Sequence, residues 1–478
     1  MSLWRTLLFA LIAAGLGAYI WLVEQPRIKD EAEPERLMTF DPQKVASVSL
    51  SYPEATSIQA IKEDGDWRLS APLAADADDG AVANLLEQIA KTEVQRRIPG
   101  NEAEPLATYG LEGDGAQARV TLMLDNDEKL PDIVVGRTTP VGYDAFARVE
   151  GRDEVLVVPL LLHSGVKKDV FALREKTLFA VAVDDALQVT LNHLTRNETI
   201  VAEREADRWK LTVPIEDLAD EEQIESLVGS LGQLTAVAYY DGDEVDRETF
   251  GLTAPSLVVD VELGDGKSAG FALGAKTNDA PPGYYIERSG DGQVARVPEW
   301  VETRFGKRVD DLRDKHMFSC DHESITRVSF ERRDGASFVL EREGDSEWRM
   351  KPDPGRPLRE DLVKRTITGL ATLAGKEVAA DIGDGGDLSL YGLDPPEVVI
   401  EVSRADGVPC GRALAGVTGD ETETPAYHIK RATGSLVMTV PAYLYSRTNM
   451  VPGDFLAPED QPVGDDPAGE SGDEPAND

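Results

Sequence analysis

The sequence predicts an α+β fold in which one N-terminal transmembrane helix precedes three tandem, mostly antiparallel β-rich repeats, each with one principal helix. Two observations lead to this prediction. Residues 3–23 are apolar apart from Arg5 and Thr6, and no charged residue follows Arg5 until Glu24. The remaining chain contains the same ordered set of short markers three times, about 140 residues apart. A set of markers that recurs in one order indicates related structural units in tandem.

The apolar segment 3–23 is long enough to cross a bilayer. A helix of this length covers ~31 Å at ~1.5 Å per residue, close to the ~30 Å hydrocarbon core. A cleavable signal peptide is the alternative, but the segment ends in bulky residues (19–23, YIWLV) where a signal peptidase needs small ones. We therefore expect an uncleaved anchor that starts in the cytoplasm (1–23), followed by a polar tether (24–44). In a bacterium this places the protein in the inner membrane as a single-pass protein, with the bulk of the chain in the periplasm.

Five markers define the repeats. The aromatic-Gly-Leu marker is an example, and it recurs at an exact spacing of 141 residues. The markers are, in order, Trp-basic-apolar (Trp67, Trp209, Trp348), aromatic-Gly-Leu (Tyr109, Phe250, Tyr391), a glycine (Gly136, Gly274, Gly416), a tyrosine (Tyr143, Tyr285, Tyr427) and Val-Pro (Val158, Val297, Val440). The tryptophans precede an apolar residue on the same strand face, a pattern typical of core residues.

These markers predict repeat units over 45–180, 186–318 and 324–450. The first copy closes on Leu-Arg-Glu-Lys (173–176) and the second on Leu-Arg-Asp-Lys (312–315), and we expect these charges to form ion pairs at the junctions between repeats. The third copy lacks this motif. Residues 451–478 are predicted to be an acidic disordered tail, since from Pro458 onward the chain has no apolar run and no basic residue.

Within a unit the pattern changes from strands to a helix and back to strands. In the first copy, short alternating runs predict strands over 45–50, 57–61 and 67–69, followed by a helix over 81–90 that Asp78 or Asp79 caps. Corresponding helices are expected over 221–234 and 359–373. The aromatic-Gly-Leu marker is typical of a helical turn that ends on a left-handed glycine. Four more strands are predicted over 118–124, 132–135, 145–149 and 155–158.

Charge and cysteine content exclude some classes of protein. The 88 acidic and 49 basic side chains give a net charge of −39, so the chain lacks the basic surface that nucleic acid requires. Adaptation to a saline habitat would also account for this acidity. Two cysteines, Cys320 and Cys410, are too few for a disulfide framework or a four-thiolate metal site. Whether these two form a bond with each other is left open.

The motifs are similar to those of a known bacterial family. Trp67-Arg68-Leu69 followed by Pro72, Tyr-Gly-Leu-Asp-Pro-Pro (391–396), Val-Gly-Arg-Thr (135–138) and Leu-Arg-Asp-Lys (312–315) resemble a domain-of-unknown-function family of membrane-anchored envelope proteins. Its members are commonly encoded beside ABC transporters of the gliding-motility type. The resemblance implies an accessory role in such a transport system and no catalytic or ligand residues. In the third copy, 415–418 lack the basic residue of the strand-end motif.

Few residues suggest chemistry. His316, Cys320 and His322 place metal-ligand types close together, but corresponding positions of the first copy are Thr177, Val181 and Val183, so we expect no metal there unless this copy gained a site. Asp76–Gly80 resembles a calcium loop, although its glycine is at the wrong position and helix capping accounts better for it. No catalytic or phosphate-binding motif is present. We expect no enzyme activity and no cofactor.

One basic stretch interrupts the acidic chain at the predicted third helix. It comprises Lys351, Arg356, Arg359, Lys364 and Arg365. A solvated helix face is the simpler interpretation, and docking of an acidic partner or anionic lipid is the alternative. The sequence as a whole therefore favours a non-enzymatic periplasmic scaffold or adaptor of an ABC-type export or gliding-motility-type system, with transporter subunits or other envelope proteins as partners. A periplasmic lipid- or glycan-binding module is the alternative, and a hydrolase has the least support.

Overall fold

A computed structural model describes residues 35–457 except 54–55, 207, 345–346, 384–385, 406 and 420–423. The expected anchor, most of the expected tether and the segment 458–478 therefore lie outside the described residues. Among the residues that are described, no helix is long and apolar enough to cross a membrane. Contacts divide the chain into two compact units, one of residues up to 199 with 225–306, the other of residues 200–224 with those from 307 onward.

The described strands form three antiparallel sheets, which confirms a β-rich fold of tandem repeats. The first sheet has the strand order β4-β3-β2-β1-β6-β7-β8-β9-β5, the second follows the equivalent order, and the third does so without a described counterpart of β4. Its strands are β1 (Val45–Ser51), β2 (Ile58–Glu63), β3 (Asp66–Ala71), β4 (Ala75–Asp76), β5 (Arg96–Pro99), β6 (Ala118–Leu124), β7 (Ile133–Thr138), β8 (Asp144–Val149) and β9 (Glu154–Pro159). The helices of this repeat are α3 (Asp79–Lys91), α4 (Leu160–Val166) and α5 (Val170–Leu173).

The second and third repeats reuse this sequence of elements. The second has β10 (Ala186–His193), β11 (Glu198–Glu205), β12 (Arg208–Val213), β13 (Asp217–Leu218), α6 (Glu221–Gly232), β14 (Ala238–Tyr240), β15 (Leu257–Leu263), β16 (Ser268–Thr277), β17 (Gly283–Arg288), β18 (Val294–Pro298), α7 (Trp300–Phe305) and α8 (Val309–Leu312). The third has β19 (Ile325–Arg332), β20 (Phe338–Glu343), β21 (Glu347–Lys351), α9 (Glu360–Ala371), β22 (Glu377–Asp381), β23 (Val398–Arg404), β24 (Pro409–Thr418), β25 (Ala426–Arg431), β26 (Leu436–Thr439), α10 (Ala442–Thr448) and α11 (Pro452–Phe455).

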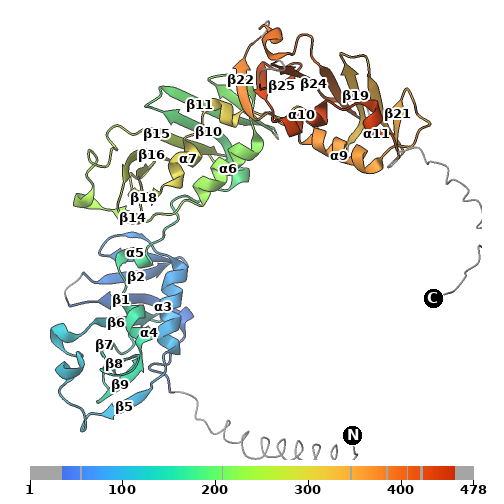
Figure 1. Cartoon of the computed structure of the whole chain (residues 1–478). Coiled ribbons are helices and arrows are strands. Elements are labelled where there is room, and N and C mark those ends of the chain that lie inside the picture. Colours follow the sequence, from blue (N-terminus) through green and yellow to red (C-terminus); the bar gives the residue numbers. More distant parts are fainter. Residues whose placement is uncertain are drawn as a thin grey trace, which may run out of the picture. The chain divides into compact units, whose positions relative to one another are not determined.

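The principal helix of each repeat forms where the apolar residues stop alternating along the sequence and instead recur every three or four residues. In the first repeat, Val82, Leu85, Leu86 and Ile89 are buried along one face of α3 and belong to the same core as residues of β1 and β2. Figure 1 shows α3 running beside the sheet that contains these strands. The carboxylate of Asp78 accepts a hydrogen bond from the Ala81 N–H at 2.9 Å, so Asp78 is the helix cap. The proposed calcium-loop alternative is thereby replaced by capping.

The glycine of the aromatic-Gly-Leu marker and the single-glycine marker that follows it are explained by one contact between them. Gly110, Gly251 and Gly392 all have φ between 68° and 70°, the left-handed conformation that ends the aromatic-Gly-Leu turn. A Cβ at Gly136 would lie 2.3 Å from the carbonyl oxygen of Tyr109, and Gly274 makes the equivalent approach to Phe250. The turn therefore packs directly on the strand that carries the second glycine, and this close approach requires glycine at both markers.

The predicted repeat boundaries need correction at both ends. Leu37 is fully buried in the first core, and the main chain of Arg36 forms an isolated antiparallel β-bridge with that of Glu93. The first repeat therefore begins within the expected tether 24–44. Phe455 is also fully buried and packs on Phe338, so the third repeat extends past residue 450 into the expected tail. Each segment has only a few apolar residues, too few to show a periodic pattern, and these are buried by cores that the rest of the repeat forms.

Candidate functional site

A cleft in the first repeat is the best candidate for a ligand site. Its volume is ≈ 820 Å³, and four separate chain segments form it. They are the end of β1 with the start of β2, the residue after β3, the turn before β6, and the connection between α4 and α5. The lining residues are Tyr52, Pro53, Thr56, Ile58, Pro72, Asp114, Ala116, Gln117, Lys167, Lys168, Asp169 and Val170.

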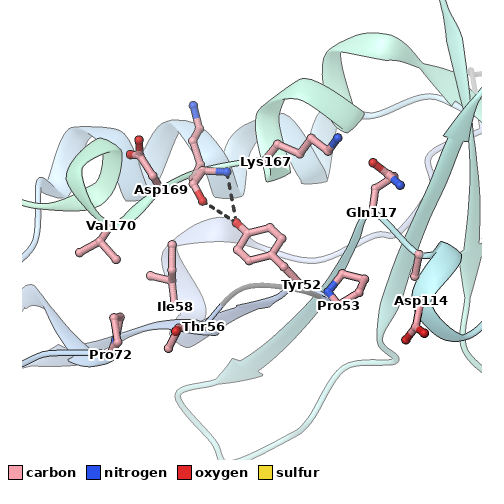
Figure 2. A pocket seen from close by; sticks show the side chains of 12 residues that line it. Tyr52, Pro53, Thr56, Ile58, Pro72, Asp114, Gln117, Lys167, Asp169 and Val170 are labelled. Atoms are coloured by element: carbon pink, nitrogen blue, oxygen red, sulfur yellow. Dashed lines mark hydrogen bonds between the residues drawn. The ribbon is translucent and has the colours of Figure 1, made fainter.

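Tyr52 holds the wall of the cleft together. Its Oη lies 2.9 Å from the carbonyl oxygens of Val166 and Lys168, which share its single hydrogen. It also accepts a hydrogen bond from the Lys168 N–H at 3.2 Å, and Figure 2 shows the two contacts with Lys168. Burial raises the pKa of the Tyr52 hydroxyl, so the group stays a neutral donor. The end of β1 is thus fixed to the α4–α5 connection, which carries both lysines.

The chemistry of the cleft is suited to binding. Thr56, Ile58, Pro72 and Val170 form an apolar region at one end, and Asp114 and Gln117 lie at the other (Figure 2). An apolar pocket with a few polar and charged groups is the common form of a small-molecule site.

The closing motif of the first repeat forms the predicted ion pair. Arg174 Nη1 lies 2.7 Å from Asp241 Oδ2, and Nη2 donates to Gln293 Oε1 at 2.6 Å. The same guanidinium stacks 3.8 Å from the ring centroid of Tyr239, whose hydroxyl donates to the Glu175 carbonyl. The Arg174 side chain is only 8% exposed, so these contacts are made in a region of low dielectric.

The second closing motif repeats this arrangement. Arg313, 4% exposed, donates to Asp217, Asp381 and Ser435. Asp381 is the positional counterpart of Asp241, since Asp381 ends β22 and Asp241 directly follows β14, the strand after the principal helix in each repeat. Asp314 adds an ion pair with Arg431 at 2.9 Å. Arginine clamps thus connect the end of one repeat with strands of the next.

The third repeat retains the segment but not the arginine. Ala77 pairs with Arg174 and Ala219 with Arg313, and the equivalent main-chain pair in the third repeat is Leu358 with Leu456. The third copy lacks the Leu-Arg-acid-Lys motif in its sequence, but its backbone forms the equivalent pair. Leu456 stands there in the position that Arg174 and Arg313 occupy in the other two pairs.

The candidate metal site is not assembled. Cys320 forms a disulfide with Cys410, so its sulfur is no thiolate ligand, and the question of whether the two cysteines pair is answered. His316 Nδ1 lies 2.8 Å from Asp314 Oδ1. In the described part of the chain, no group of three or more His, Cys, Asp or Glu side chains is placed to hold a metal ion. His322 therefore gains no partners for coordination.

The basic stretch 351–365 lies along β21 and α9 and is partly neutralised. Lys351 pairs with Glu341 at 2.5 Å, Arg365 with Asp361 at 2.6 Å and Arg356 with Asp353 at 4.0 Å. Arg359 occupies the N-cap position of α9, and Lys364 is exposed on that helix. The five side chains thus remain on the surface, with acidic neighbours from their own repeat.

A repeated surface feature escaped the sequence analysis. The second residue after each Val-Pro marker is large, apolar and exposed: Leu161 (68%), Trp300 (41%) and Tyr443 (64%). Leu161 borders a groove of ≈ 470 Å³ between α3 and α4. Alignment of the three copies on Val-Pro would have revealed the shared position. Each repeat thus exposes a large apolar side chain at the same position after its Val-Pro marker.

The family assignment agrees with this repeat geometry. The model of the Domain of unknown function (DUF4340) family matches the chain twice, at residues 67–255 and 209–396. The chain belongs to this family. The matches are offset by 142 residues at their starts and 141 at their ends, which is the spacing of the markers. Each match starts at a Trp marker and includes one arginine clamp. It contains two aromatic-Gly-Leu turns and ends shortly after the second of them. No curated protein and no solved structure matches the chain significantly.

Proposed function

We propose that this DUF4340 protein is a non-enzymatic scaffold or adaptor, anchored in the bacterial inner membrane through residues 3–23, with its repeats in the periplasm. It would serve an ABC-type export or gliding-motility-type system. The observation that supports this best is the exposed apolar residue at one position of all three repeats, Leu161, Trp300 and Tyr443. A scaffold needs contact residues presented at regular places, and large exposed side chains are the usual anchors of such contacts.

Two further observations favour this proposal. The arginine clamps use buried side chains to join a repeat to the next, which is what a protein that holds partners in a fixed order requires. The Cys320–Cys410 disulfide is of a kind that persists in oxidising compartments such as the periplasm and is rare in the cytosol. Protease accessibility in spheroplasts tests the location, because a chain that stays protected from added protease would contradict it.

The scaffold is tested by recovery of partners. The full-length protein is purified from its own membranes after mild crosslinking, alongside a variant with Leu161→Ser, Trp300→Ser and Tyr443→Ser. We expect transporter subunits to copurify with the wild type and to be depleted at least fivefold with the variant. Leu390→Ser is the matched control, since Leu390 is equally exposed (69%) but has no counterpart in the other repeats. Recovery of the protein alone, or equal loss in the control, would reject the role.

A lipid- or glycan-binding module is the second candidate function, and the cleft at Tyr52 is the observation that favours it. Lys167 and Lys168 beside the apolar region would suit a ligand with an anionic and an apolar part, whereas Asp114 and Gln117 would suit sugar hydroxyls. Native mass spectrometry with a bacterial lipid extract, and separately with envelope oligosaccharides, distinguishes the two. Binding should be weakened by Lys167→Glu with Lys168→Glu but not by the exposed control Lys91→Glu on α3.

A further inference from the structure

The hairpin turn between β7 and β8 exposes large apolar side chains in the first repeat. Val141 and Tyr143 are 88% and 87% exposed, the two highest values among the large apolar side chains that the structure describes. The turn is held in one shape, because the Thr139 hydroxyl donates to the Val141 carbonyl at 3.0 Å and Gly142 takes the φ of 100° that glycine favours. The corresponding turn of the second repeat, residues 278–282, contains no Val, Leu, Ile or aromatic residue.

Leu161 lies beside this turn and enlarges the exposed apolar surface. The Leu160 N–H donates to the Tyr143 carbonyl at 2.8 Å, and Leu161, 68% exposed, follows directly. We call Val141, Tyr143 and Leu161 the apolar tip. Arg137, where the hairpin leaves β7, is exposed and forms no ion pair with the residues that the structure describes. Apolar side chains gathered at one exposed place mark an interaction site, in contrast to single scattered ones.

The described chain begins at the same end of the first sheet as the apolar tip. Asp144, at the start of β8, pairs with Pro159, at the end of β9, and β9 pairs antiparallel with β5, which starts two residues after Val94. The Val94 N–H donates to the Glu35 carbonyl at 2.7 Å. Three strand spacings of ~4.8 Å thus place Glu35 about 15 Å from the strand that follows Tyr143.

This position limits how far the apolar tip can be from the membrane. The proposed anchor ends at residue 23, and the chain from there to residue 35 reaches at most ~40 Å at ~3.3 Å per residue. A surface tethered so closely meets the bilayer at a high effective concentration, so a small apolar contact is enough to hold it there. Tyrosine is enriched at membrane–water interfaces, and a cation beside an apolar surface is attracted to lipid phosphates.

We propose that the apolar tip of the first repeat inserts into the interfacial region of the bilayer. The inference rests on the proposed anchoring through residues 3–23 and adds a second attachment, which fixes the orientation of the first repeat on the membrane. Val141 and Tyr143 supply the apolar contact, and Arg137 faces the phosphates. A partner held at Leu161 would then lie at the membrane surface, where transporter subunits emerge from the bilayer.

Lipid quenching of a fluorophore on the full-length protein tests this proposal. The two native cysteines form a disulfide, so Val141→Cys provides one thiol for an environment-sensitive NBD label. The protein is reconstituted into phosphatidylethanolamine–phosphatidylglycerol vesicles with and without nitroxide-labelled lipid. We expect the emission at position 141 to be shifted to the blue and quenched by about half, as for an interfacial side chain. Leu390→Cys, a 69% exposed position of the third repeat, is the matched control and should show neither effect.

Substitutions at Tyr143, made with the label at position 141, provide the second measurement. Tyr143→Asp should reduce the quenching to the level of the control, because a carboxylate is costly to place in the interface, whereas Tyr143→Trp should preserve it. Tyr443→Asp, at a 64% exposed position of the third repeat, should leave the quenching unchanged.

The outcomes separate the apolar tip from the anchor. Flotation of the protein with the vesicles reports the anchor, and a chain that does not float would overturn the anchor and the tip proposal together. A chain that floats but shows no quenching at position 141, or equal quenching at position 390, would overturn the tip proposal alone. A blue shift without lipid quenching would assign the tip to a protein contact, with a second copy or another partner, and would also overturn it.

Discussion

Arg313 Nη1 lies 2.6 Å from Asp381 Oδ2, and this ion pair joins the closing segment of the second repeat to β22 of the third. Arg365 Nη2 is at the same 2.6 Å from Asp361 Oδ2, yet the two pairs differ in environment. The Arg313 side chain is 4% exposed and that of Arg365 is 68% exposed. Burial, not distance, is therefore expected to decide how much each pair contributes to stability.

Arg313→Ala should destabilise the junction by about 1–3 kcal/mol. This is below the ~3–5 kcal/mol for breaking a fully buried pair, because Asp217 and Asp381 remain 23% and 43% exposed and can be rehydrated. Arg365→Ala is the matched control and should cost less than ~0.5 kcal/mol. Urea unfolding followed by circular dichroism measures both, and equal losses would show that the clamp is no more than a surface ion pair.

Reduction of the Cys320–Cys410 disulfide should lower the stability of the third repeat by about 2–4 kcal/mol. The bond closes a loop with a sequence separation of 90 residues, so its loss restores much conformational freedom to the unfolded chain. Thermal unfolding with and without dithiothreitol measures the effect. The double variant Cys320→Ser with Cys410→Ser should show the lowered midpoint in both conditions, and a wild type that does not respond to reductant would contradict the prediction.

The repeat was readable from the sequence because its markers depend on backbone requirements. Gly110 and Gly136 are both glycines since no other residue fits a left-handed turn packed on a strand, and this requirement recurs in every copy. The closing segment was not readable in the third copy, because main-chain pairing between Leu358 and Leu456 specifies no side chain. Short β5 was also missed, since its four residues show no alternation.

The candidate cleft was beyond sequence reasoning for a different reason. Its lining residues extend from Tyr52 to Val170 and carry no shared motif. The equivalent positions of the three repeats hold different residue types: Tyr52 directly follows β1, His193 ends β10 and Arg332 ends β19. Arg332 donates to the carbonyl of Met450, as Tyr52 does to that of Lys168. Equivalent contacts made by unlike side chains leave no pattern in a sequence.

Removal of residues 451–457 should unfold or loosen the third repeat, whereas removal of 458–478 alone should not. Phe455 is fully buried against Phe330 and Phe338, so Phe455→Ala should cost about 3–5 kcal/mol through lost burial and the resulting cavity. Chains that end at 450 and at 457 are compared with the full chain by near-ultraviolet circular dichroism. Identical spectra and midpoints for all three would place the end of the repeat back at 450.

Three histidines should have pKa values that differ from the usual histidine value in opposite directions. The hydrogen bond that His316 donates to the Asp314 carboxylate raises the pKa of His316 above 6.5, and burial lowers the pKa of His163 and of His428 below it. NMR titration of the ring protons measures all three in one sample. Asp314→Asn should return the His316 value toward 6.5 and leave those of His163 and His428 unchanged.

The sign of the linked effect on stability follows from the direction of this shift. A histidine whose pKa is raised by folding stabilises the folded state when it is protonated in both states, that is, below its unfolded value of ~6.5. That contribution is lost as the pH rises from ~6.5 through the higher folded pKa. The difference in unfolding free energy between wild type and His316→Gln should therefore shrink between mildly acidic and alkaline pH, and a difference that stays constant or grows would show that the His316–Asp314 pair does not form.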